Sequence, residues 1–272
     1  MVNGYTPTSL AEALAIRARE IVTPYAGGTD LMIDERREGS YLFLHRVQEM
    51  KGIRREGELL CLGAACTYTA LMESALTPAL LKEAIALIAA PAIRNEGTIG
   101  GNIANGSPKA DSALIFFVAD ASLRLASVRG ERVMPIRDFY LGRKQLALMP
   151  DELIVEVLLP MTWMEHYCYE KVGARKALAI SRVAFAGLMT IRDGVIQHAA
   201  TAFGSVSDVI IRKPELDAML IGKTVAQAKA VRDAYLEAYR EVIVPIRGRV
   251  SAEYRKQVCV NLLTEFLSQH GI

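Results

Sequence analysis

A polar, glycine-rich stretch in the middle of the chain interrupts a pattern of apolar segments and constrains the fold more than any other feature. Residues 98–112 contain three glycines, two asparagines and three hydroxyl residues. This density of small hydrogen-bonding groups suits a surface against a ligand with many oxygens, such as a dinucleotide. Asp111 could accept hydrogen bonds from ribose or ribityl hydroxyls. This second glycine segment therefore predicts a binding surface, and the alternative is a long structural loop.

The first glycine segment lies about 70 residues upstream, at residues 26–31. We expect it between a short strand that begins at Ile21 and a helix that Thr29 or Asp30 caps and that runs to about Arg37. Glycines there allow positive φ and a close approach of ligand to backbone. Free amides and the dipole of a helix start favour an anion such as a phosphate. Alone, the segment could equally be a tight strand–helix turn without a ligand.

The two familiar phosphate-binding motifs are absent. Gly101 and Gly106 have the glycine spacing of a P-loop, but Ser107 and Pro108 replace its Lys-Ser/Thr pair. No G-x-G-x-x-G opens a helix either. A nucleotide must therefore be held by two separated segments that converge. We expect a β-carbon on Gly100 or Gly101 to collide with the pyrophosphate or to conflict with a positive φ.

Composition excludes several classes of function. The 272 residues, 51% hydrophobic and 23% charged, suffice for one large or two ordinary globular domains. A net charge of +2 without runs of like charge argues against nucleic-acid binding. No stretch is long and apolar enough for a membrane span, and no secretory signal is visible, so we expect a cytoplasmic protein. Four cysteines and four histidines are dispersed, which indicates buried free thiols and no metal site.

The apolar periodicity predicts an α+β fold with a domain boundary near residues 162–166. The first domain, 1–162, divides into subdomains of about 1–55 and 56–162, and the second spans 163–272. Ser9 and Glu12 have capping-box spacing, as do Thr224 and Gln227, and Asp193-Gly194 is a hairpin signal. The expected strands are 21–22, 41–44, 58–63, 122–127, 131–135, 152–159, 167–172, 183–191 and 195–202, and the expected helices are 10–18, 67–73, 78–89, 110–119, 214–220, 225–242 and 253–269.

Both glycine segments resemble the pyrophosphate loops of one family, the FAD-binding subunits of the molybdenum hydroxylases. Ala26-Gly27-Gly28-Thr29-Asp30-Leu31 is similar to the first loop, and Thr98-Ile99-Gly100-Gly101-Asn102-Ile103-Ala104-Asn105 to the second. The preceding Pro91-Ala92-Ile93-Arg94-Asn95 also matches. Residues 171–177 resemble a basic segment whose lysine, here Lys171, lies beside the isoalloxazine. The resemblance covers essentially the whole chain.

The resemblance implies a vanillyl-alcohol-oxidase-like FAD-binding region of two subdomains, followed by a small domain of about three antiparallel strands and helices. It implies FAD as the cofactor, a 2Fe–2S small subunit and a molybdopterin-binding large subunit as partners, and NAD or another electron acceptor. Lys171, with Arg175 and Lys176 as further candidates, would stabilise negative charge on the reduced flavin. The residues expected to bind FAD are Ala26, Gly27, Gly28, Thr29, Asp30, Leu31, Thr98, Ile99, Gly100, Gly101, Asn102, Asn105, Ser107, Asp111 and Lys171.

Two other functions remain open from the sequence. One is a self-sufficient FAD-dependent reductase or oxidase of the same fold superfamily, such as the enolpyruvyl-UDP-sugar reductases. That reading requires acid and base residues in the second domain, where no His/Glu pair stands out. The other is an assembly protein that has lost the flavin, against which the intact glycine segments argue.

Overall fold

The computed structural model describes residues 3–33, 39–175, 178–246, 248 and 250–272. The chain forms two compact units. The first unit comprises Met1–Pro78, Ile88–Ser107 and Asp120–Pro160, and the second comprises Ala79–Leu87, Pro108–Ala119 and Met161–Ile272. Two segments that precede residue 160 therefore pack with the C-terminal part of the chain.

A small parallel sheet opens the first unit. Its strands are β1 (Asn3–Tyr5), β3 (Ser40–Phe43) and β2 (Val22–Tyr25), in that order. Helix α1 (Leu10–Arg19) begins where predicted, with the Ser9 hydroxyl accepting from the Glu12 amide at 3.2 Å. The Glu12 carboxylate accepts from the amide of Thr8 at 2.8 Å instead of that of Ser9, so only half of the predicted capping box forms.

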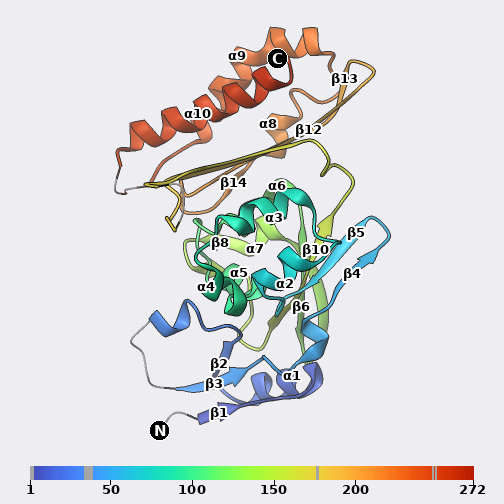
Figure 1. The fold of residues 1–272 in the computed structure, drawn as a ribbon, viewed down its shortest axis with the longest axis vertical. Coiled ribbons are helices and arrows are strands. Elements are labelled where there is room, and N and C mark those ends of the chain that lie inside the picture. Colours follow the sequence, from blue (N-terminus) through green and yellow to red (C-terminus); the bar gives the residue numbers. More distant parts are fainter. Residues whose placement is uncertain (1–2, 34–38, 176–177, 247, 249) are drawn as a thin grey trace. The chain divides into compact units, whose positions relative to one another are not determined.

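An antiparallel sheet carries the rest of the first unit (Figure 1). Its order is β4 (Ile53–Glu56), β5 (Leu59–Gly63), β10 (Leu153–Pro160), β6 (Ser122–Ser127) and β7 (Gly130–Pro135). The central strand β10 is buried on both faces, since consecutive residues point to opposite faces and all residues from Leu153 to Leu159 are buried. Short elements complete the unit: η2 (Gln48–Met50), α2 (Tyr68–Glu73), α7 (Ile136–Phe139), β8 (Tyr140–Gly142) and β9 (Gln145–Leu146).

The second glycine segment is more helical than predicted. The expected loop follows α4 (Pro91–Glu96) and contains the whole of α5 (Ile99–Ala104). Glycine disfavours helix, but Thr98 caps α5 and Ile99 and Ile103 are fully buried, so packing outweighs propensity. The helix expected after Asp30 is a 3₁₀ turn, η1 (Leu31–Ile33), and its predicted continuation to about Arg37 lies outside the described residues.

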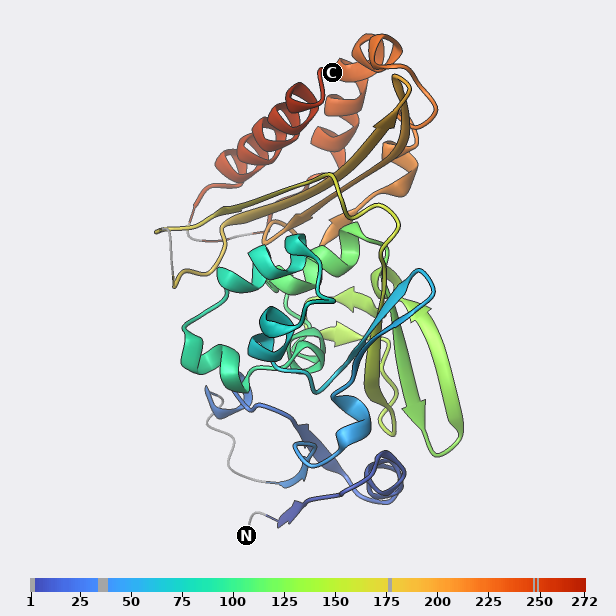
Figure 2. The ribbon, with the colours of Figure 1, turned by 45° about the vertical axis from the view of Figure 1, so that its right-hand side comes forward.

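The second unit is an antiparallel sheet with helices on both faces (Figures 1 and 2). Its strands run in the order β11 (Tyr167–Val172), β12 (Val183–Arg192), β13 (Val195–Gly204) and β14 (Ile211–Arg212). The first three strands were predicted; β14 has only two residues and leaves no periodic signal. Helices α9 (Val225–Val242) and α10 (Ala252–Gln269) lie side by side on one face, and α3 (Ala79–Ala86) and α6 (Asp111–Val118) pack against the other. A short helix, α8 (Pro214–Asp217), follows β14.

Local signals in this unit are confirmed. Asp193 and Gly194 have φ values of 51° and 74°, which is the turn geometry that the hairpin signal predicts. Thr224 and Gln227 form the reciprocal capping box at the start of α9.

Among the described residues, none of the helices is both long and apolar enough to span a bilayer, and no cluster of His, Cys, Asp or Glu could hold a metal ion.

Candidate cofactor-binding site

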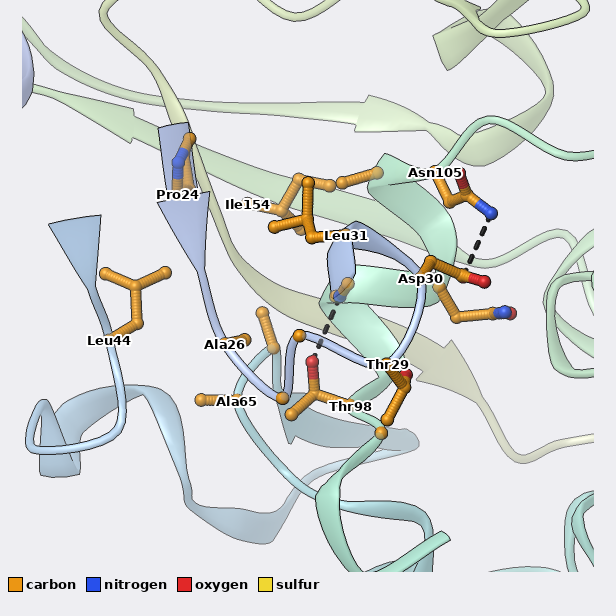
Figure 3. Close-up of a pocket in the computed structure, with 18 of the residues that line it drawn as sticks. Pro24, Ala26, Thr29, Asp30, Leu31, Leu44, Ala65, Thr98, Asn105 and Ile154 are labelled. Atoms are coloured by element: carbon orange, nitrogen blue, oxygen red, sulfur yellow. Dashed lines mark hydrogen bonds between the residues drawn. The ribbon is translucent and has the colours of Figure 1, made fainter. Parts of the chain in front are cut away.

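The two glycine segments meet at one cavity of about 750 Å³ in the first unit (Figure 3). All six residues of the first segment line it. The second segment contributes Thr98, Gly100, Gly101, Asn102 and Asn105, together with Ala104. The predicted convergence of the two segments is therefore present in the fold.

Direct contacts hold the two segments together. The side-chain amide of Asn105 donates through Nδ2 to the carboxylate of Asp30 at 2.9 Å, as Figure 3 shows. A β-carbon on Gly27 would lie 1.7 Å from the carbonyl oxygen of Glu96, so only glycine permits this approach. Gly28 has a φ of 69°, which confirms the expected left-handed backbone in the first segment. Tyr25 also lies against the α-carbon of Gly28.

The positive φ expected as one alternative at Gly100 and Gly101 is wrong, because both lie in α5 and neither has a positive φ. The other alternative, a collision with the pyrophosphate, stays a prediction. A β-carbon on Gly100 would lie 2.6 Å from that of Ala64, so Gly100 is required by packing inside the protein. A β-carbon on Gly101 would meet only the hydroxyl of Thr98 within 4 Å, and Gly101 is exposed on the cavity wall. The positive φ of this segment is at Gly106, at 61°.

Backbone amides for an anion come from the first segment. At the start of α5, the amides of Ile99, Gly100 and Gly101 already donate to Cys66 O, Ala64 O and Thr98 Oγ1. The amides of residues 27–31 have no hydrogen-bond partner among the described residues. Unpaired amides in a glycine turn favour a phosphate oxygen. The second segment instead offers the open face of Gly101 and the side chains of Asn102 and Asn105.

Charged residues that the sequence did not single out also line the cavity. Arg17, half-buried on α1, donates to the carbonyl of Val22, and burial lowers the pKa of its guanidinium. Glu152 accepts from Arg132 at 2.6 Å and 2.8 Å, and this pairing lowers the pKa of the Glu152 carboxyl. The apolar part of the wall comes from distant segments, which no local pattern could have joined: Leu44, Met50, Ala64, Ala65, Tyr68, Leu148, Leu153 and Ile154.

Comparison with known families shows which family the chain belongs to. Residues 1–162 match the family described as the FAD binding domain in molybdopterin dehydrogenase, and residues 168–270 match the CO dehydrogenase flavoprotein C-terminal domain. The chain belongs to this flavoprotein family. It is an FAD-binding oxidoreductase subunit of the molybdenum-hydroxylase type, and its cofactor is FAD.

Individual relatives support the assignment of this FAD-binding subunit. The chain is 32% identical to the xanthine dehydrogenase FAD-binding subunit of Escherichia coli O157:H7, over 90% of this chain and 87% of that protein. It is 31% identical to the carbon monoxide dehydrogenase medium chain of Afipia carboxidovorans, over 93% and 91% of the two chains. It superposes on a chain of the carbon monoxide dehydrogenase of Hydrogenophaga pseudoflava with a TM-score of 0.89, at 28% identity and with coverage of 97% and 95%.

The cavity of the FAD-binding subunit fits its cofactor. A volume of about 750 Å³ is within the range of small-molecule sites. The unpaired amides of residues 27–31 suit the negatively charged pyrophosphate, and the missing side chain of Gly101 leaves space on the opposite segment. The apolar side chains of the wall supply surface for flat rings.

Four residues predicted to bind FAD do not line this cavity. Ile99, the first residue of α5, is fully buried inside the protein. Ser107 follows α5 and is not part of the cavity wall. Asp111 and Lys171 belong to the second unit, where the Lys171 ammonium donates to Asp111 Oδ2 at 2.7 Å and to Leu87 O at 2.8 Å. Asp111 Oδ1 also accepts from Ser181 Oγ at 2.6 Å.

The Lys171–Asp111 pair therefore has partners inside its own unit. Both side chains are buried, at 9% and 8% exposure. Their expected roles, beside the isoalloxazine for Lys171 and toward ribose or ribityl hydroxyls for Asp111, stay predictions. Arg175 donates to the carbonyl of Leu178 at 2.6 Å, and Lys176 lies outside the described residues.

Proposed function

We propose that this chain is the electron-transfer subunit of a molybdopterin-dependent dehydrogenase. In this assignment it receives electrons from the 2Fe–2S clusters of a small partner subunit, which drain a molybdopterin-binding large subunit. It then passes them through FAD to NAD or another acceptor. The convergence of two glycine segments on one cavity, in a chain of this family, carries the proposal.

The contacts described above support a role for each glycine segment in binding FAD. The pyrophosphate would lie against the amides of residues 27–31 and the open face of Gly101. Asp30 and Asn105 would fix the separation of the two segments through their hydrogen bond. Residues 1–162 would act as the FAD-binding domain and 163–272 as the C-terminal domain. When bound, FAD supplies a redox centre that accepts and releases electrons; the chain's residues hold and orient it.

The names of the relatives support the proposal that this chain has partner subunits. The matched protein of Afipia carboxidovorans is a medium chain, and that of Eubacterium barkeri is the FAD-subunit of a nicotinate dehydrogenase. In the described residues of this chain no side-chain cluster could ligate a metal. The iron–sulfur and molybdenum centres would accordingly be supplied by other chains.

Purification of the chain from its native host tests the proposal. An affinity-tagged chain should carry one FAD and should bring with it two further polypeptides together with iron and molybdenum. The same chain expressed alone should bind FAD without either metal. A flavin that purines, aldehydes or heterocycles reduce in the isolated chain would contradict the subunit assignment and favour a self-sufficient flavoenzyme. FMN as the released flavin would contradict FAD as the cofactor.

The electron acceptor is tested separately. Anaerobic NADH should reduce the flavin of the isolated chain if NAD is the acceptor, and the visible absorbance of the flavin reports this directly. A flavin that NADH leaves oxidised, in a chain that still binds FAD, would assign another acceptor and leave the subunit assignment intact.

A further inference from the structure

A second cavity, of about 460 Å³, lies within the second unit. It shares no lining residue with the cavity of about 750 Å³ in the first unit, called the FAD cavity below. Four basic residues line it: Lys109, Arg175, Arg182 and Arg255. None of the described residues on its wall is acidic. A concave surface lined by one sign of charge concentrates ligands of the opposite sign.

The sequence around this cavity has the same bias. In the sequence, residues 172–182 and 243–252 together contain five basic residues and no acidic one. Described residues from both ranges line the cavity. Asp111 is adjacent, since it accepts from Ser181, but it is paired with Lys171 and does not line the cavity. No carboxylate therefore lies among the described residues of the wall.

Arg255 is the strongest indication of a ligand. Its side chain is only 3% exposed, and Nη1 donates to the carbonyls of Ser205 and Val206 at 3.3 and 3.4 Å. Its Nε and Nη2 atoms are buried and have no hydrogen-bond partner in the described part of the chain. The hydroxyl of Ser205 is likewise buried and has no hydrogen-bond partner there. Buried donors without partners are costly, most of all when charged. A bound anion would satisfy them.

The remaining wall defines the kind of anion. Arg255 is in the first turn of α10, where the helix dipole favours negative charge, and Gly248 and Val250 precede this turn on the wall. Apolar side chains complete the lining, and the volume exceeds the space that a single oxyanion fills. We propose that this cavity binds a phosphate group, carried by a small organic molecule or free, with the oxyanion held by Arg182, Arg255 and Ser205.

Calorimetric titration of the FAD-loaded protein tests this site. The probes are inorganic phosphate and AMP, at constant ionic strength. Arg182→Gln removes a cation from the wall while its backbone bond to Val172 remains. It should weaken binding of the probe by about tenfold, because a charge-assisted hydrogen bond is lost. Lys229→Gln, an exposed position on α9, removes the same charge outside the cavity and should change nothing.

Each outcome has a defined meaning. Tighter binding of AMP than of phosphate identifies an organic phosphate, and equal binding identifies the free ion. Arg255→Gln should also weaken binding, and circular dichroism checks that α10 is retained. The flavin spectrum shows that the FAD cavity is unaffected. If neither probe binds, or if Arg182→Gln binds like the unaltered protein, the proposal is wrong.

Discussion

At the scale of single residues, Gly100 and Gly101 are neighbours in α5 but have different surroundings. The α-carbon of Gly101 faces the FAD cavity, so Gly101→Val should give a folded protein that has lost FAD. The α-carbon of Gly100 faces Ala64, so Gly100→Ala should lower the free energy of unfolding by about 1–3 kcal/mol through overpacking. Urea denaturation and flavin occupancy separate the two effects. Normal occupancy in Gly101→Val would show that the pyrophosphate lies elsewhere.

The buried pair of Lys171 and Asp111 is a second residue-scale feature with a measurable effect. Lys171→Ala leaves the Asp111 carboxylate buried, with the Ser181 hydroxyl as its one remaining side-chain partner among the described residues. This should lower the free energy of unfolding by about 3–5 kcal/mol. Adding Asp111→Asn removes the unpaired charge and should recover part of that loss. A double-mutant cycle by urea denaturation measures the coupling, and strictly additive effects would contradict it.

The same variants test the predicted influence of Lys171 on the flavin. Lys171→Ala leaves one uncompensated negative charge and should lower the midpoint potential by tens of millivolts, since about 30 mV corresponds to 1.4 kcal/mol for a two-electron couple. The double variant with Asp111→Asn is neutral at the pair, as the native protein is, and should return toward the native potential. Redox titration decides the matter. An unchanged potential in Lys171→Ala with full FAD occupancy would assign the pair a structural role alone.

At the scale of elements, Arg132 on β7 is tied to Glu152, which immediately precedes β10 and lines the FAD cavity. Arg132 lowers the pKa of the Glu152 carboxyl in the folded protein. The pair therefore contributes stability that is present above the ordinary glutamate pKa of about 4.3 and is lost as the pH falls below it. Glu152→Gln should reduce the free energy of unfolding at pH 7 and flatten its decline at acid pH, measured by urea denaturation. An unaltered pH dependence would show that the pair contributes nothing.

At the scale of the whole molecule, the cysteines report on the integrity of both units. Burial raises the pKa of Cys66 and Cys168 to about 11 and that of Cys259 to about 12, and it also raises the pKa of Cys61. At pH 8 this lowers the thiolate fraction of the first three by about 100-fold or more. Thiol reagents should therefore label the native protein slowly and all four cysteines quickly in denaturant. Rapid labelling of native Cys66 or Cys259 would mean that its unit opens locally.

The sequence alone determined the features that depend on local chemistry or on a characteristic motif. The turn at Asp193-Gly194, the caps at Ser9 and Thr224, and the order of the longer strands and helices follow from short-range backbone preferences. The family and its cofactor followed from the two glycine segments, because close contact with a pyrophosphate tolerates few residue types.

The tertiary structure alone decided which residues line the cavity and which pack or pair inside the protein. Gly100 and Gly101 are equivalent in a sequence, but Ala64 packs against one and the cavity opens beside the other. Asp111 lies in the predicted segment, yet its side chain pairs with Lys171, 60 residues away along the chain. Such assignments rest on contacts between distant segments, which form only when the core is assembled and which no local pattern encodes.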